Sequence, residues 1–147
     1  MSIIEYLASS LEGITPFAHQ DCYPYNRPYC RIKESNIEEC PAEDSMRIFD
    51  LTLESLSHAG MALPEHGLCF QGELLVEVAF PCGLGGTLLE RYFENEVGQI
   101  VETFCGKDHS TAGIRTIRHI GSQHTESQKT PMELFAHRFA INYERQS

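Results

Sequence analysis

The fold is decided by one stretch of sequence, GELLVEVAFP (residues 72–81). Apolar side chains occur there with a period of two, which places successive residues on opposite faces of a strand. One face carries Leu74, Val76, Val78 and Phe80, and the other carries Leu75, Glu77 and Ala79. Because both faces are largely apolar, we expect this strand, which begins near Leu68, to lie in the centre of a sheet.

A long helix is predicted directly after this strand. Proline and glycine residues at 81–86 end the strand, and Thr87 and Glu90 have the spacing of a capping box. The helix runs to about Phe104, and Gly98 in its middle suggests the close approach of another backbone. Its apolar stripe consists of Leu89, Tyr92, Phe93, Val97, Ile100, Val101 and Phe104.

The segments before the central strand predict a second helix and a first strand. Residues 2–12 have helical apolar spacing and end at Gly13, and residues 29–34 alternate like a half-buried strand. Residues 45–59 fit either a helix or a pair of strands. From about 41 to 66 the chain is interpreted as an inserted arm or hairpin.

Two closing strands are predicted at 114–120 and 132–143, joined by a polar loop at 121–131. His137 falls on the apolar face of the last strand and is expected to be a core or interface histidine. The chain is thus predicted to be one α+β domain over 1–147. It would consist of a single mixed, mostly antiparallel sheet with an N-terminal helix and one long amphipathic helix packed on it.

Composition restricts the function further. The 147 residues carry a formal net charge of -10, which repels phosphate backbones and disfavours general nucleic-acid binding. Apolar runs are short and the N-terminus lacks a basic start, so we expect neither a membrane span nor secretion. The six cysteines include no Cys-x-x-Cys pair and are interpreted as free thiols.

Two sequence patterns resemble ligand sites without completing them. The glycine-rich turn from Gly83 to Thr87 could hold phosphate at a helix start, but it does not complete a dinucleotide-binding or Walker motif. The pairs His19/Cys22 and His66/Cys69 have zinc-like local spacing, but nothing in the sequence brings the two pairs together. We therefore expect no cofactor and no metal.

Catalytic candidates are equally sparse. Cys105 lies near Asp108 and His109, but a nucleophile at a helix C-terminus has a raised rather than a lowered thiol pKa. The acidic pairs Glu38/Glu39, Glu43/Asp44 and Glu94/Glu96 are expected on solvated faces. The sequence therefore predicts no catalytic residue and a protein that is not an enzyme.

The order of these elements resembles the small tail-terminator and tail-completion (neck) proteins of long-tailed bacteriophages. In that family a strand such as residues 72–81 leads through a glycine-containing loop into a helix such as 88–104. The chain then ends in a strand such as 134–143. The resemblance covers residues 1–12, 68–105 and 113–145, whereas the segment 40–66 is longer than the pattern requires.

This resemblance implies a non-enzymatic virion protein, made in the host cytoplasm, that forms a ring, commonly of six copies. The ring would cap the tail tube, contact the tail-tube and head-neck proteins, and let DNA pass through an acidic lumen without specific binding. Edge strands and the segment 40–66 are expected to make the subunit contacts. Within that segment the predicted interface residues are Arg47, Phe49, Leu51 and Leu53.

Two alternatives from other classes stay open. The chain could be an acidic cytoplasmic chaperone or adaptor, which would expose an apolar patch for its partner. It could also be a small nucleotide- or metal-binding enzyme that uses the turn from Gly83 to Thr87, in which case nucleotides or metal would raise its thermal stability.

Overall fold

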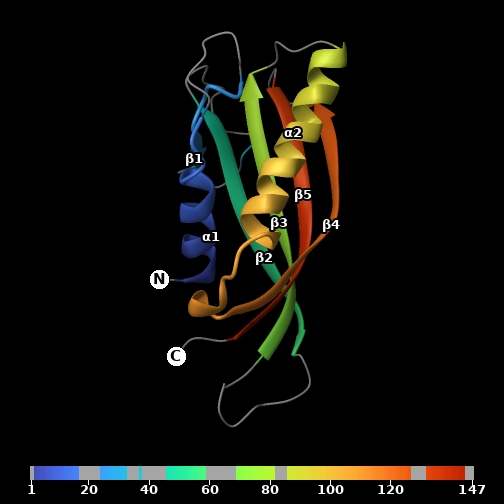
Figure 1. Cartoon of the computed structure of the whole chain (residues 1–147). Coiled ribbons are helices and arrows are strands. Elements are labelled where there is room, and N and C mark those ends of the chain that lie inside the picture. The colour runs from blue at the N-terminus through green and yellow to red at the C-terminus, as the bar shows by residue number, and fades with distance from the viewer. Residues whose placement is uncertain are drawn as a thin grey trace.

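The computed structural model describes residues 2–16, 24–32, 37, 46–58, 69–81, 86–126 and 132–144. They form an α+β fold in which one five-stranded sheet carries two helices on the same face (Figure 1). The elements follow the chain in the order α1 (Ile3–Glu12), β1 (Tyr29–Arg31), β2 (Arg47–His58), β3 (Cys69–Pro81), α2 (Gly86–Cys105), η3 (Ser110–Ala112), β4 (Ile114–Glu126) and β5 (Met132–Glu144).

The sheet has the strand order β1-β2-β3-β5-β4. β1 is parallel to β2, and the other neighbours are antiparallel, so the predicted mixed, mostly antiparallel sheet is confirmed. β3 lies in the centre as the sequence predicts. Residues 47–58, which were ambiguous in sequence, form the continuous strand β2 between β1 and β3.

The last hairpin differs from the sequence prediction. Residues 121–126, predicted to be loop, continue β4 as far as Glu126, and the strand pairs with β5 along its whole length. The polar side chains of this segment do not signal a strand. Backbone hydrogen bonds to β5 nevertheless make the segment a strand, because strand propensity depends strongly on context.

The main core lies between the sheet and the helices. It combines Leu7 and Leu11 of α1 with the apolar side chains of β2, β3 and β5 and the inner face of α2, including Tyr92, Ile100 and Phe104. A smaller core on the opposite face of the sheet covers only one end. Its buried members are Ile37, Ile48, Ala79, Met132 and Leu134. Among the described residues, the rest of that second face is partly or fully exposed.

Gly98 lies in the exposed part of α2. A Cβ atom at this position would meet nothing within 4 Å, so the close backbone approach predicted from sequence is wrong. Gly72 of β3 is different, because a Cβ atom there would lie 2.8 Å from the carbonyl oxygen of Glu54. The glycine that the packing requires is therefore the one in the strand.

Candidate functional site

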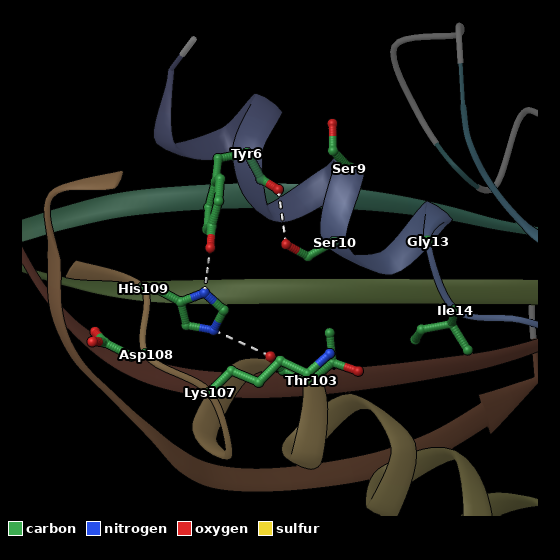
Figure 2. Close-up of a pocket in the computed structure, with 9 residues that line it drawn as sticks. All are labelled: Tyr6, Ser9, Ser10, Gly13, Ile14, Thr103, Lys107, Asp108 and His109. Atoms are coloured by element: carbon green, nitrogen blue, oxygen red, sulfur yellow. Dashed lines mark hydrogen bonds between the residues drawn. The ribbon is translucent and has the colours of Figure 1, made fainter. Parts of the chain in front are cut away.

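A hollow of about 260 Å³ lies between α1, the end of α2 and the segment that follows it. Figure 2 shows His109 beneath Tyr6, with one ring nitrogen directed at each helix. His109 Nε2 lies 3.1 Å from the carbonyl oxygen of Thr103, which can only accept, so Nε2 donates. In the neutral ring Nδ1 then accepts from the Tyr6 hydroxyl at 2.6 Å. Both nitrogens are thus used to hold α1 against α2.

The predicted cluster of Cys105, Asp108 and His109 does not form a catalytic unit. The Asp108 carboxylate accepts from the backbone N–H of Ser110, and this bond lowers the pKa of the carboxyl group. Partial burial raises the pKa of the Cys105 thiol. The direction predicted for the thiol is confirmed, with burial as its main cause, and His109 is engaged with Tyr6 and Thr103 instead.

The most unusual group in the described chain is Glu96 on the inner face of α2. Its side chain is 0% exposed, so the prediction that Glu94 and Glu96 both lie on a solvated face is wrong for Glu96 and confirmed for Glu94. Oε1 accepts from the hydroxyl of Tyr92 at 2.7 Å and from that of Tyr29 at 3.3 Å. Oε2 lies 2.9 Å from Nε2 of His137.

The two tyrosines remain protonated donors in this site. Burial raises the pKa of both Tyr29 and Tyr92 well above the ordinary value of 10.0, and the nearby Glu96 carboxylate raises it further. The guanidinium carbon of Arg47 lies 3.8 Å from the centre of the Tyr29 ring, a cation–π contact. Burial alone lowers the pKa of Arg47, but the two tyrosines and Glu96 outweigh it and raise the pKa.

A chain of hydrogen bonds leads from Glu96 to strand β4. His137 Nε2 must donate, because a carboxylate only accepts. In the neutral imidazole, Nδ1 therefore accepts from the hydroxyl of Ser122 at 2.8 Å. Ser122 Oγ in turn accepts from Nε2 of His119, also at 2.8 Å. The direction of all these bonds follows from the one fully buried carboxylate.

A β-bulge makes this alignment possible. Residues 119 and 122 would point to opposite faces of a regular strand, because they are three positions apart. The register shifts between His119 and Gly121, so Ile120 is an extra residue, and His119 and Ser122 both face the helices. Ser122 lies opposite His137 in the register, and the ring of Phe93 on α2 stacks on His137.

The sequence indicated only part of this site. His137 was predicted to be a core or interface histidine, and its 1% exposure confirms the core position. Glu96 was missed, although it follows Tyr92 by four residues and precedes Ile100 by four, which places it inside the apolar stripe. Ser122 and His119 could not be found, because the bulge and the long β4 depend on pairing with β5.

The predicted interface residues lie in the protein's own core. Arg47 and Phe49 are fully buried, Leu51 is almost buried, and Leu53 is partly buried against the main core. The interface prediction is therefore wrong for the first three, because these odd positions of β2 face the helices. The even positions of the same strand, from Asp50 to Glu54, face the opposite side of the sheet, away from the helices.

Several sequence candidates fall outside the described residues. They are His19, Cys22, Glu38, Glu39, Cys40, Glu43, Asp44, His66 and the turn 82–85. Cys30 and Cys105 are free thiols. In the described part of the chain, no group of three or more His, Cys, Asp or Glu side chains could hold a metal ion.

No protein-family model matches the sequence, and no curated protein matches it. The described helices include none with the length and apolar character needed to cross a membrane.

Proposed function

We propose that this chain is a subunit of the ring that caps the tail tube of a long-tailed bacteriophage and forms the surface for joining the head. It would act by self-association and by docking to tail-tube and neck proteins. The order of helices and strands described above is the order on which the family resemblance rests. The observation that carries the proposal is the open, acidic face of the sheet.

This face is organised in rows across four strands. One row is Asp50, Glu77, Ala136 and Gln123, the next is Thr52, Leu75, Arg138 and Gly121, and the third is Glu54, Glu73, Ala140 and Arg118. We call these three rows the acidic face. Carboxylates stand directly opposite one another on β2 and β3, an arrangement that destabilises a sheet. Arg138 relieves part of this repulsion through a 2.7 Å ion pair with Glu73.

Repulsive pairs of this kind suit a surface that must not adhere to DNA. With four carboxylates against two guanidinium groups, the acidic face repels a phosphate backbone. Five strands spaced about 4.8 Å apart span about 20 Å, so six sheets side by side would close a circle roughly 40 Å across. Such a lumen is wide enough for a DNA duplex.

The chaperone alternative receives no comparable support. Among the described residues, the exposed large apolar side chains are Leu88 at 59% and Ile120 at 54%, and they lie on different elements, α2 and β4. Two isolated side chains do not form the contiguous patch that a chaperone would present. The glycine-rich turn of the enzyme alternative lies at 83–87, mostly outside the described residues.

The test is the native mass of the purified protein by light scattering over a range of concentrations, with negative-stain images alone and with tail tubes. A closed ring, formed alone or on tubes, is the expected result. A monomer or tight dimer that never forms rings and does not bind tubes would refute the proposal.

A charge-reversal pair tests the orientation of the acidic face in the ring. Glu73→Lys with Glu77→Lys should leave ring assembly intact but make the ring retain duplex DNA at low salt, with retention falling as salt rises. The matched control, Glu90→Lys with Glu94→Lys, places the same charges on the exposed side of α2. Equal DNA retention by both variants would contradict a lumen lined by the acidic face.

A further inference from the structure

We propose that Ser122 is the nucleophile of an acyl-transfer site built from Ser122, His137, Glu96 and His119. The inference is independent of the proposed ring, because it rests on side chains of one subunit. Acyl transfer by serine requires a base in contact with the hydroxyl, a carboxylate that orients the base, and a hydrogen-bond donor for the developing oxyanion. Each of these groups is present within hydrogen-bond distance.

The base is His137. Its Nδ1 lies 2.8 Å from Ser122 Oγ, and its Nε2 lies 2.9 Å from Oε2 of Glu96. Glu96 acts as a positioning residue. It fixes the tautomer in which Nδ1 is free to take the serine proton, and its charge stabilises the imidazolium that results. Because Glu96 is fully buried and accepts from two tyrosines, the imidazole cannot easily reorient.

The oxyanion donor is His119. Its Nε2 lies 2.8 Å from Ser122 Oγ and donates to it in the resting state. In the tetrahedral intermediate, the oxyanion is bonded to the carbon that is attached to Oγ, and it would lie within reach of the same N–H. His119 can therefore shift its hydrogen bond from Oγ to the oxyanion. Side-chain donors of this kind, histidine included, serve in oxyanion holes.

Access comes from the edge of the sheet. β4 is the outermost strand and is hydrogen-bonded only to β5 in the described sheet. Ser122 and His119 are both only partly buried, so each residue of the pair keeps some contact with solvent at this edge. β-Bulges such as the one beside Ser122 often lie next to active sites. A partly buried serine at a sheet edge fits an ester of a short acyl group.

The reaction balances with water as the second substrate. Ser122 Oγ bonds to the ester carbonyl carbon while its proton moves to Nδ1 of His137. The tetrahedral intermediate collapses, the carbon–oxygen bond to the alcohol breaks, and the alcohol leaves with that proton. Water then gives its proton to His137 and its oxygen to the acyl carbon. The acid departs and Ser122 recovers its proton.

The test uses p-nitrophenyl acetate for turnover and a fluorophosphonate probe for covalent labelling, both read on the full-length protein. We expect one adduct per chain, located on Ser122 by peptide mass spectrometry. Ser122→Ala should abolish the adduct and lower hydrolysis about 100-fold or more. Ser10→Ala, which changes a half-buried, hydrogen-bonded serine of α1, is the matched control and should behave like the parent.

Two further variants separate catalysis from folding. His119→Ala, at a half-buried edge position, should keep the circular dichroism of the parent and slow acylation about 100-fold through loss of the donor. His137→Gln should abolish labelling at every pH, and His119→Ala should decide the question if His137→Gln does not fold. Absence of any adduct on the parent protein, or an adduct that persists in Ser122→Ala, would overturn the proposal.

Discussion

Glu96 of α2 and His137 of β5 are 41 residues apart in sequence, yet their side chains lie 2.9 Å apart and are both almost completely buried. A buried carboxylate is costly unless its oxygens are satisfied, and here three donors satisfy it. This contact ties α2 to β5 and, through Tyr29, to β1. It also sets the direction of the hydrogen-bond chain that ends at His119.

Removal of the Glu96 partner should therefore be strongly destabilising. We expect His137→Ala to lower the free energy of unfolding by about 3–5 kcal/mol, because an uncompensated carboxylate stays buried. Urea denaturation followed by circular dichroism measures this. Glu94→Ala, at an exposed position of the same helix, should change stability by less than about 0.5 kcal/mol. Equal effects of the two substitutions would contradict the buried network.

Alkaline pH should unfold the protein through Tyr29 and Tyr92. Their pKa values are raised in the folded state above the ordinary value of 10.0, so the folded protein binds more protons than the unfolded chain above that pH. The free energy of unfolding should be unaffected by these groups below pH 10 and fall as pH rises beyond it. Tyr29→Phe removes one such group, so the denaturation midpoint of this variant should fall less steeply with rising pH than that of the parent protein. A steeper fall would disagree with this assignment.

Two glycines should respond in opposite directions to alanine. Gly98→Ala should raise the free energy of unfolding by about 1 kcal/mol, because Gly98 is an exposed helix position with room for a methyl group. Gly72→Ala should destabilise the sheet, because its Cβ atom would collide with the carbonyl oxygen of Glu54. Thermal denaturation of both variants makes the comparison. Stabilisation by Gly72→Ala would show that β2 and β3 are not this close.

Cys105 should react slowly with iodoacetamide despite its exposed position. Partial burial raises the pKa of its thiol, so less thiolate is present at pH 7.5 than in free cysteine. Peptide mass spectrometry follows this cysteine separately from the other five, with free cysteine as the reference compound. The rate should rise with pH past the range where free cysteine levels off. Alkylation faster than that of free cysteine would mean that the thiol is activated.

The local elements could be predicted from sequence because their signals are periodic. The apolar pattern of residues 72–81 indicated a central strand, and the stripe ending near Phe104 indicated the long helix. The predictions failed where the structure of a segment depends on its pairing with another strand. Residues 45–59 fit two periods in sequence, and only hydrogen bonding to β1 and β3 makes Arg47–His58 a strand. Residues 121–126 are too polar to indicate a strand without β5 beside them.

The sequence by itself determined the class of fold, the central position of β3, the place of His137 on the apolar face of the last strand and the excess of acidic groups. Period and composition are local properties, so they can be read without the partner segments. The tertiary structure alone decided which carboxylate is buried, which face of β2 is free, and that a bulge aligns His119 with Ser122. These features depend on contacts between segments far apart in the chain, and neighbouring residues do not encode such contacts.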